Sequence, residues 1–494
     1  MTKAREPYRF GVTRAPELAA PGGVWFNVPG PLTLRDLRGR LVILDFWTAG
    51  CVNCHHVLPT LAMIEARFPR EVAVVGIHSP KFPAERGPSV AMAAIARLGI
   101  GHPVLHDPGL HLWRHYAVRA WPTLVLIGPD GRIVASDAGE PDAARLMAAV
   151  EAIVMAGRNA GTLLPGSLSL MPAPLPGGRF AFPGKIRRLP LPLGRADYVL
   201  ADTGHHQIVL LDATGGEVAR IGAGIAGPGD GPWGGARFNA PQGVFADGTA
   251  IWVADTGNHL IRRIDLGAFT VSTVAGFGRR GPILQDPLPG PIAGLASPFD
   301  LVGDGRQLFV ANGGSHQILA YDLGHGMMRP VAGNGAEGLR DGAGFDAVLA
   351  QPSGLDRAAD GSIGFVDAES SALRLLDPAT GAVTTLAGQG LFDFGAVDGP
   401  AESALMQHPQ ALCFDGPRRL LIADSLNGLI RRFDRDTGRL ETPEQTCEDP
   451  VCLPGGAPNG ICPDGAGGFI LADTDNHRLL RFDPARGTTV TFAA

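Results

Sequence analysis

A short pattern that recurs six times in the C-terminal part of the chain places the strongest limit on its fold. Each copy has an Asp or Asn at the end of an apolar run and a second Asp ten residues later. The copies begin at Asp202, Asp255, Asn312, Asp367, Asp424 and Asp473, and the second position is Asp212, Asp265, Asp322, Asp377, Asp434 and Asp483. Successive copies lie between 49 residues (Asp424 to Asp473) and 57 residues (Asp255 to Asn312) apart, which suits four strands with their loops. Six such units close into a ring that buries its sheet edges, so the pattern predicts an all-β six-bladed propeller.

Further features of the copies indicate a known repeat. Several copies continue into a strand that ends in Ala-Gly, and a segment such as Pro241-Gln-Gly243 leads into the next copy. These strings resemble the NHL repeat family over roughly residues 180 to 494. Three copies depart from the common form: Asn312 replaces the Asp, Ser370-Ser371 replaces Asn-His, and Gly428 replaces the His. The departures leave the predicted architecture intact and predict blades with different surfaces.

The N-terminal part follows another pattern. Apolar strands are predicted at 41–46, 72–77 and 124–127, and helical stretches at 57–67, 89–98 and 143–154. Continuous apolar strands between helices indicate an α/β domain whose sheet is covered on both faces. Five prolines between Leu163 and Gly184 then interrupt the alternation. The expected organisation is therefore a multidomain chain with an α/β domain at 1–160, a Pro-rich linker at 161–183 and the propeller at 184–494.

Two cysteines mark the candidate chemical site. The sequence Cys51-Val52-Asn53-Cys54 directly follows a predicted buried strand and opens a helix. Backbone N–H groups and the dipole at a helix N-terminus favour a thiolate there. We therefore expect Cys51 to be the nucleophile and Cys54 the resolving thiol.

The residues around these cysteines resemble the thioredoxin-fold oxidoreductases. The resemblance rests on Asp45, Trp47, the two cysteines and Pro59, and on Trp121-Pro122-Thr123 before the last buried strand. It implies that Asp45 is a buried acid that exchanges a proton with Cys54, and that Pro122 is the cis-proline that faces the dithiol. Catalytic roles are thus expected for Cys51, Cys54, Asp45 and Pro122. A substrate-binding surface is expected at Trp47, Trp121 and Thr123.

The order of the two domains extends the resemblance. The helical insert between Ile77 and Leu124 is similar to that of the TlpA-like and peroxiredoxin branches. Together with the propeller, the chain resembles the NHL-repeat-containing protein 2 family, and we expect it to lack that family's additional C-terminal β-domain. The resemblance implies a thiol–disulfide oxidoreductase that needs no cofactor beyond its dithiol. Expected partners are protein disulfide or dithiol clients, which the propeller would recognise, and a reducing protein.

Other functions for the dithiol remain open. Cys51 to His55 also matches the haem-attachment string, but such attachment requires export. A zinc site would need four ligands, and His55 and His56 point in different directions on a helix. Thr48 lies three residues before Cys51 as in peroxiredoxins and favours a thiol peroxidase, although Leu44 stands where that family has Pro. The last alternative is a non-catalytic interaction scaffold with a vestigial dithiol.

The remaining histidines and cysteines give weaker signals. No ligand spacing is visible among five histidines, which are expected at the surface or around the site: His78, His102, His106, His111 and His115. In the propeller, the recurring His206, His259, His316 and His477 are expected to fix turns rather than bind metal, which an NHL-type lyase would require. Cys413 is expected to be an inert buried thiol. Two of the three cysteines Cys447, Cys452 and Cys462 could form a disulfide, but a reducing cytosol would keep all of them reduced.

Charge and hydropathy exclude several partners. The net charge of −6 gives no basic surface for nucleic acid, and no apolar run is long enough for a membrane span. No apolar segment follows the basic residues at the N-terminus, so no secretory signal is predicted. The expected location is cytoplasmic.

Overall fold

The computed structural model describes residues 11–174, 176–447 and 456–494, and the chain forms two compact units. The first unit is Met1–Leu175 and the second is Pro176–Ala494. The division falls inside the predicted linker. The first part of that linker packs on the first unit, where Leu164 N donates to Gly39 O and Met171 N donates to Asn27 O, both at 2.8 Å.

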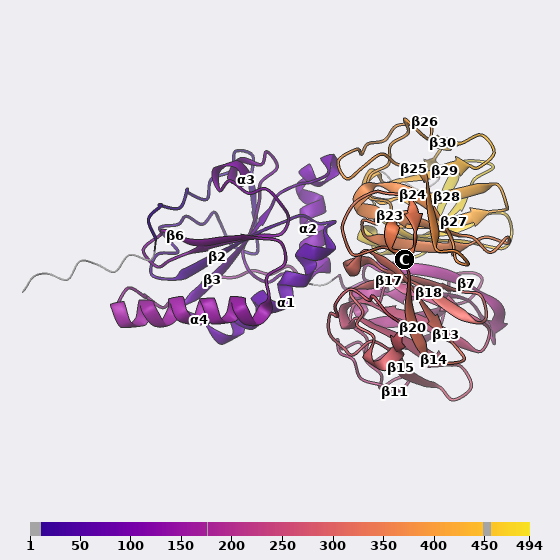
Figure 1. Cartoon of the computed structure of the whole chain (residues 1–494), viewed down its shortest axis with the longest axis horizontal. Coiled ribbons are helices and arrows are strands. Elements are labelled where there is room, and N and C mark those ends of the chain that lie inside the picture. Colours follow the sequence, from indigo (N-terminus) through magenta and orange to yellow (C-terminus); the bar gives the residue numbers. More distant parts are fainter. Residues whose placement is uncertain (1–10, 175, 448–455) are drawn as a thin grey trace, which may run out of the picture. The chain divides into compact units, whose positions relative to one another are not determined.

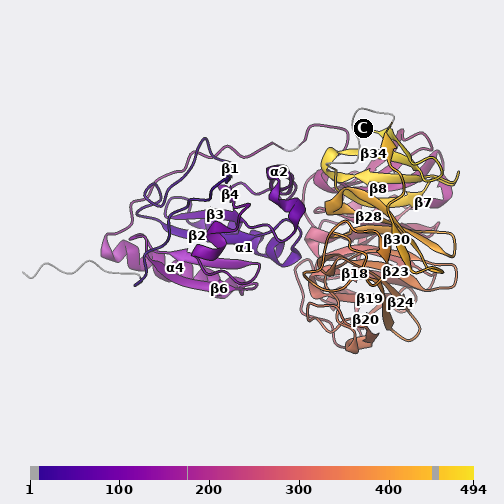
Figure 2. The same ribbon diagram turned by 90° about the horizontal axis from the view of Figure 1, so that it is seen from above.

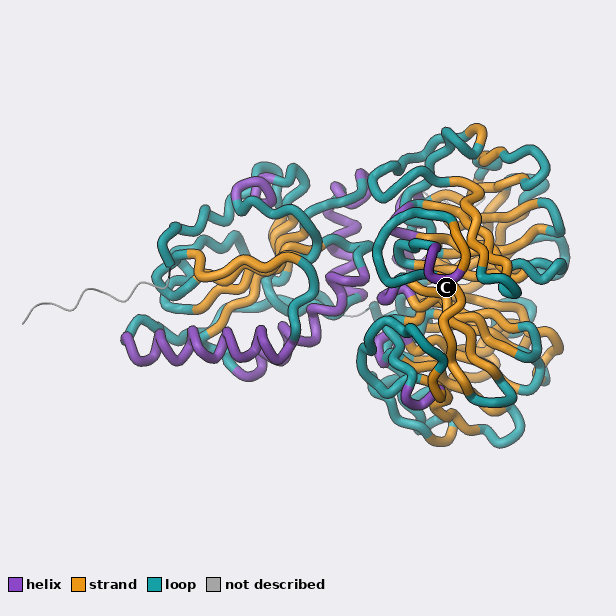
Figure 3. Tube along the Cα trace, in the orientation of Figure 1, coloured by secondary structure: helices purple, strands orange, loops and turns teal. Residues whose placement is uncertain are grey.

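The first unit contains one mixed six-stranded sheet (Figures 1 and 3). In spatial order its strands are β1 (Val24–Phe26), β4 (Val104–His106), β3 (Val72–His78), β2 (Leu41–Trp47), β5 (Thr123–Ile127) and β6 (Ile133–Ala138). Strand β2 pairs in parallel with β3 and antiparallel with β5. The helices are α1 (Val52–Arg67), α2 (Pro88–Arg97), α3 (His111–His115) and α4 (Ala143–Ala160), with a 3-10 turn η1 at Pro83–Arg86. This is the predicted thioredoxin-like α/β fold.

The central strand β2 explains why the sheet is covered on both faces. All seven of its residues are buried. Leu41 and Ile43 pack in the same apolar cluster as Leu61 of α1, whereas Val42 belongs to the cluster of the opposite face. Because side chains alternate along a strand, Asp45 and Trp47 lie on the α1 face.

The second unit is the predicted six-bladed propeller. Blade 1 contains β7 (Pro183–Leu193), β8 (Ala196–Asp202), β9 (Gln207–Leu211) and β10 (Glu217–Ile221). Blade 2 contains β12 (Gly243–Ala246), β13 (Ala250–Asp255), β14 (Leu260–Asp265) and β15 (Thr270–Ala275). Blade 3 contains β17 (Pro298–Gly303), β18 (Gln307–Asn312), β19 (Gln317–Asp322) and β20 (Met327–Ala332).

The remaining blades repeat this order. Blade 4 contains β22 (Pro352–Arg357), β23 (Ile363–Asp367), β24 (Ala372–Asp377) and β25 (Ala382–Ala387). Blade 5 contains β27 (Ala411–Asp415), β28 (Arg419–Asp424), β29 (Leu429–Asp434) and β30 (Arg439–Glu441). Blade 6 contains β32 (Pro458–Pro463), β33 (Phe469–Asp473), β34 (Arg478–Asp483) and β35 (Thr488–Ala493). The last blade, yellow in Figure 2, contacts the first through β32 and β7, which closes the ring.

The four-stranded prediction holds for blade 1 only. Each of the other blades has an additional two-residue strand, which pairs outside its outermost strand. These strands are β11 (Gly231–Pro232), β16 (Leu288–Pro289), β21 (Gly342–Ala343), β26 (Gly399–Pro400) and β31 (Thr446–Cys447). They come from the loops between blades, so their pairing is fixed by tertiary contacts that the repeat pattern does not encode.

The recurring histidines join neighbouring blades. His206, His259, His316 and His477 each adopt a left-handed backbone conformation after a 3-10 turn. Their Nδ1 atoms accept hydrogen bonds from backbone N–H groups in the segments that lead into the first strand of the neighbouring blade. The donors are Ala240, Ser297, Gln351 and Phe182 respectively. The bond from Phe182 N to His477 also helps to close the ring. The expected hydrogen bonds therefore exist, but they connect blades rather than fix a single turn.

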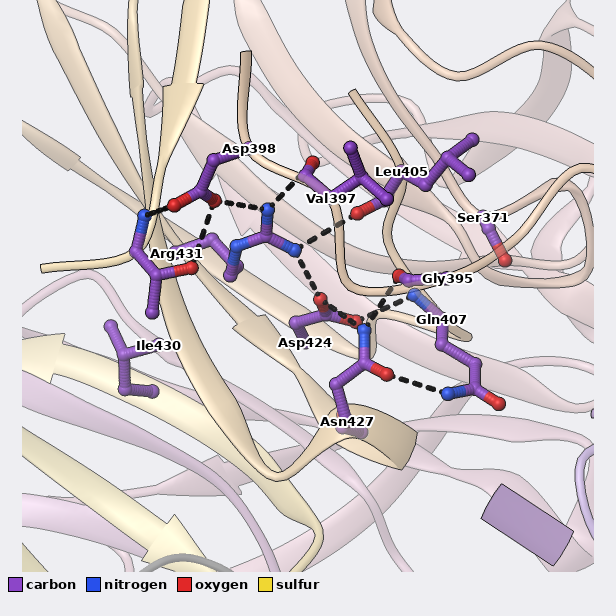
Figure 4. A network of polar contacts seen from close by, with 12 residues as sticks. Ser371, Gly395, Val397, Asp398, Leu405, Gln407, Asp424, Asn427, Ile430 and Arg431 are labelled. Atoms are coloured by element: carbon purple, nitrogen blue, oxygen red, sulfur yellow. Dashed lines mark hydrogen bonds and ion pairs between the residues drawn. The ribbon is translucent and has the colours of Figure 1, made fainter. Parts of the chain in front are cut away.

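Three blades share a buried ion pair, shown for blade 5 in Figure 4. Arg431 donates to Asp424 at 2.8 Å and to Asp398 at 2.6 Å, and also to the carbonyls of Val397 and Leu405. Blades 2 and 4 repeat the arrangement with Arg262 and Arg374. The first Asp of these copies is thus a structural anchor, and the Asp-Gly loop that contains Asp398 supplies its second carboxylate.

None of the described helices is both long and apolar enough to cross a membrane.

Candidate functional site: the Cys51–Cys54 dithiol

The dithiol lies at the N-terminus of α1, as the sequence predicts. Strand β2 ends at Trp47, Cys51 is the extended residue that caps α1, and the helix begins at Val52. Cys54 N donates to Cys51 O at 3.1 Å, which folds the two residues into the first turn. The cysteines are reduced, with Cys51 7% exposed and Cys54 1% exposed. Cys51 is therefore the thiol nearer to solvent, which suits the expected nucleophile.

Cys54 is held as a thiol. Burial raises the pKa of Cys54 well above its ordinary value, and a hydrogen bond with Cys51 and the nearby Asp45 carboxylate raise it further. Cys54 must therefore lose its proton to a base before it attacks a mixed disulfide.

Asp45 is placed to be that base. Its side chain is fully buried on the α1 face of β2, and neither carboxyl oxygen has a hydrogen-bond partner among the described residues. Burial raises the pKa of Asp45 to about 7, while nearby His102 opposes the rise. A carboxyl group with a pKa near neutrality is able to take and release a proton under physiological conditions.

A second buried carboxylate, Glu85, was not among the predicted site residues. Glu85 lies in η1 and is fully buried. It accepts hydrogen bonds from Thr48 Oγ1 at 2.5 Å and Gly50 N at 3.1 Å, and also from the backbone N–H groups of Lys81 and Phe82. Glu85 thus ties the loop before Cys51 to the segment after β3. The proline at the start of a short turn and the acid two residues later were the only local signals for it.

The predicted cis-proline segment lies at the start of β5. The Trp121–Pro122 peptide bond is cis. Trp121 is partly buried against the apolar cluster that contains both cysteines, its Nε1 donates to Ser79 O at 2.9 Å, and its ring lies 4.3 Å from that of Trp113. Trp121 is therefore an accessible apolar residue beside the dithiol, and Pro122 follows it directly.

The other two predicted substrate-binding residues are not accessible. Trp47 is 1% exposed and packs in the core with Cys54, because its position in β2 directs it beneath α1. Thr123 is buried, and its hydroxyl donates to Ala120 O at 2.7 Å. The prediction of surface roles for Trp47 and Thr123 is wrong, since both side chains are used for packing.

Three of the histidines expected at the surface or around the site are buried. His78, His102 and His106 are all nearly inaccessible. The Nδ1 atoms of His78 and His106 lie 2.9 Å apart, and His102 Nδ1 lies 3.3 Å from Glu65 Oε2. A surface position is therefore wrong for them, because His78 and His106 end the fully buried strands β3 and β4, and His102 lies in the buried segment just before β4.

The histidines beside the dithiol have other contacts. His55 Nε2 lies 3.1 Å from Ala49 O, and His56 Nδ1 lies 2.9 Å from Glu140 Oε1. Across the described residues, no group of three or more His, Cys, Asp or Glu side chains is arranged to hold a metal ion.

The propeller thiols differ from the dithiol. Cys413 on β27 and Cys462 on β32 are buried and reduced. Burial raises the pKa of Cys462 to about 12 and that of Cys413 well above its ordinary value. Cys452 and the side chain of Cys447 lie outside the described residues, so the predicted pairing among these cysteines stays a prediction.

Comparisons with known proteins place these features in context. Residues 13–136 match the AhpC/TSA family. Over 449 residues the chain is 36% identical to NHL repeat-containing protein 2 of Gallus gallus, an alignment that covers 83% of this chain and 61% of the chicken protein. The chain thus spans about three fifths of that relative. Over 106 residues it is 28% identical to the thiol-disulfide oxidoreductase ResA of Halalkalibacterium halodurans, with 21% of this chain and 56% of ResA covered. A crystal structure of a thioredoxin-like superfamily protein aligns with 29% of this chain and 97% of its own, at 30% identity and a TM-score of 0.27.

Proposed function

We propose that this chain, a homologue of NHL repeat-containing protein 2, is a thiol–disulfide oxidoreductase whose propeller recognises protein clients. The observation that carries the proposal is the buried Asp45 carboxyl group, which has no hydrogen-bond partner among the described residues and raises the pKa of Cys54. An unpaired buried carboxyl group destabilises a fold, so its presence under a dithiol favours a chemical role over a packing role.

The reaction follows from the order of exposure. The Cys51 thiolate, nearer to solvent, attacks one sulfur of a client disulfide and forms a mixed disulfide, and the other client sulfur leaves as a thiolate. Cys54 then gives its proton to Asp45, and its sulfur attacks the Cys51 sulfur. The Cys51–Cys54 disulfide forms as the bond from Cys51 to the client breaks, and the second client sulfur leaves as a thiolate. A reducing protein dithiol restores the pair.

Exposed apolar residues support a client-binding role for the propeller. Ile225, Phe277 and Phe392 are exposed in loops that follow the outermost long strands of blades 1, 2 and 4. Because strands alternate in direction, these loops lie at one end of the propeller, whereas Phe269 in the β14–β15 turn lies at the other. We expect Phe392→Ser to weaken capture of a client more than Phe269→Ser does. Phe269 is the control because it is also exposed but lies at the other end of the propeller.

The activity is tested by a redox titration in glutathione buffers, with alkylation and mass spectrometry to follow each thiol. We expect reversible two-electron oxidation of Cys51 and Cys54 that Cys51→Ser abolishes. Cys413→Ser is the matched control, because it removes a buried thiol from a propeller strand. If the Cys51–Cys54 pair neither oxidised nor exchanged with a mixed-disulfide probe, the proposal would fail and the non-catalytic scaffold would be favoured.

A thiol peroxidase is the second candidate, and the match to the AhpC/TSA family favours it. It predicts rapid sulfenic acid formation at Cys51 on addition of peroxide. The hydroxyl of Thr48, however, is buried and donates to Glu85. That hydroxyl is therefore already used in the fold, and disulfide exchange is the better supported of the two reactions.

A further inference from the structure

Three buried polar groups meet beside Gly76 on the α1 face of the sheet. Asp45 of β2 is the register partner of Gly76 of β3. A Cβ atom at position 76 would lie 3.0 Å from Trp47 Nε1 and 3.5 Å from His102 Nε2. Neither nitrogen, nor either oxygen of Asp45, has a hydrogen-bond partner among the described residues. The Asp45 carboxyl group and the His102 ring nitrogen therefore lie on the same side of the sheet. Because residue 76 is glycine, it has no side chain that could separate them.

His102 connects this interior position to the surface. Its side chain is only 5% exposed, and its Nδ1 lies 3.3 Å from Oε2 of Glu65, a residue of α1 that is 33% exposed. Asn27 Nδ2 donates to His102 O at 2.9 Å and to Ile100 O at 2.7 Å, which fixes the backbone just before β4. The imidazole thus has one nitrogen directed to the buried side and the other bonded to a carboxylate that reaches solvent.

The proposed reaction needs such a connection. When Cys54 resolves the mixed disulfide, its proton passes to Asp45, and the client sulfur leaves as a thiolate that is protonated from solvent. Asp45 is then neutral and fully buried. It must return its proton to solvent before the next turnover, because only the carboxylate is able to accept the proton of Cys54.

We propose that His102 and Glu65 form the proton relay between Asp45 and solvent. Since no direct hydrogen bond joins Asp45 to His102, a water molecule between them carries the proton to His102 Nε2, and His102 releases the proton on Nδ1 to Glu65. The role of the relay depends on the proposed oxidoreductase function. The positions of Asp45, His102 and Glu65 are observed independently of that function. Imidazole suits the role because its two nitrogens can gain and lose protons on opposite sides of one ring.

The other titratable groups near Asp45 do not offer the same route. Cys54 faces it from α1, but Cys54 is the proton source. His78 and His106 lie two register pairs beyond Gly76 along β3 and β4, and their Nδ1 atoms lie 2.9 Å apart. Burial lowers the pKa of His78 to about 3, so it stays neutral. His106 Nε2 lies 3.0 Å from the carbonyl of Arg86, which leaves His102 as the histidine linked to a surface carboxylate.

The test measures the reset of Asp45 between turnovers, as the steady-state rate at which a fluorescent peptide disulfide is reduced under excess reducing protein. We expect His102→Ala to slow this step about tenfold at pH 7, and added imidazole to restore most of the rate. In an Asp45→Asn background the same substitution should have no further effect. His56→Ala is the matched control, since the side chain of His56 on α1 is also largely buried and its Nδ1 lies 2.9 Å from a carboxylate oxygen, that of Glu140.

Two further measurements keep the proposal open to rejection. Glu65→Gln, at a partly exposed position, should slow the step without disturbing the fold. The Asp45 titration, followed by infrared spectroscopy in the reduced protein, should shift to higher pH in His102→Ala, because His102 lowers the pKa of Asp45. If the wild-type protein exchanged no disulfides, the proposed function would fail. The infrared titration would still measure whether the protonation of Asp45 depends on His102. Wild-type rates in both variants, or an Asp45 titration unchanged by His102→Ala, would overturn the relay.

Discussion

Asp45 in the thioredoxin-like unit and Asp424 in blade 5 are both fully buried carboxylic acids with different surroundings. Asp424 accepts hydrogen bonds from Arg431, Asn427 and the backbone of Gln407. Asp45 has no hydrogen-bond partner among the described residues. Burial raises the pKa of both, Asp45 to about 7 and Asp424 to about 6, and at Asp424 the charge of Arg431 opposes the rise.

The difference separates a structural acid from a chemical one. A buried carboxylate with a cation and several donors stabilises one conformation, and exchange of its proton would break the network. A buried carboxyl group without donors changes its protonation at little structural cost. The number of partners, rather than burial or the shift of the pKa, therefore indicates which acid takes part in chemistry.

Removal of the structural acid should have the largest effect on stability. Asp424→Asn leaves the guanidinium of Arg431 buried with only the half-exposed Asp398 as a charged partner. Loss of one partner from a buried pair costs roughly 3–5 kcal/mol, so we expect about 4 kcal/mol of lost propeller stability. Hydrogen-exchange mass spectrometry of blade 5 peptides in the full chain measures it, and unchanged protection would contradict the structural assignment.

Removal of the chemical acid should change stability in the opposite direction. The folded-state pKa of Asp45 is raised, so the folded state holds the proton more tightly and loses stability as the pH rises from about 4 to 7. A shift to about 7 is worth roughly 4 kcal/mol, and we expect Asp45→Asn to gain about 3 kcal/mol above pH 7 because the amide also lacks partners. The gain should shrink as the pH falls towards 4. Denaturant titrations of both reduced proteins at pH 5 and pH 8 measure it, and equal stabilities at pH 8 would contradict the prediction.

The sequence predicts the fold of both units because their patterns are local. The repeated Asp positions and the strand–helix alternation predict the six blades and the α/β sheet. The second carboxylate of each ion pair escapes prediction, since Asp398 and Arg431 are 33 residues apart and meet only when the blade has formed. The two-residue outer strands escape it for the same reason.

At the candidate site, the sequence identifies residues that spacing defines and misses those that packing defines. Cys51, Cys54 and Asp45 are separated by fixed steps along a strand and a helix, so their proximity follows from local geometry. Glu85 and His102 come from the segment between β3 and β5 and reach the site by way of tertiary contacts. Trp47 is misjudged because the motif gives its identity, whereas its burial depends on α1 and α2.

Glu85 is intermediate between Asp45 and Asp424. Both oxygens of its carboxylate accept hydrogen bonds, but all the donors are neutral groups. Glu85→Gln keeps the size of the side chain and places an NH₂ group among N–H and O–H donors. We expect a loss of about 2 kcal/mol and a looser Thr48–Gly50 loop. Denaturation of the reduced protein measures the loss. Wild-type stability would show that Glu85 is not a structural acid.

The smallest expected effect tests whether neutral donors matter at the structural acids. Asn258 donates to Asp255 Oδ2 and to Gly227 O, both at 2.8 Å. Blade 3 has Ser315 at the corresponding position, where it bonds to Asn312. We expect Asn258→Ser to cost about 1 kcal/mol, because Arg262 and the backbone N–H of Asn239 still hold Asp255. Hydrogen exchange of blade 2 peptides measures the cost, and a loss as large as that of Asp424→Asn would mean that the amide, rather than the cation, stabilises these buried carboxylates.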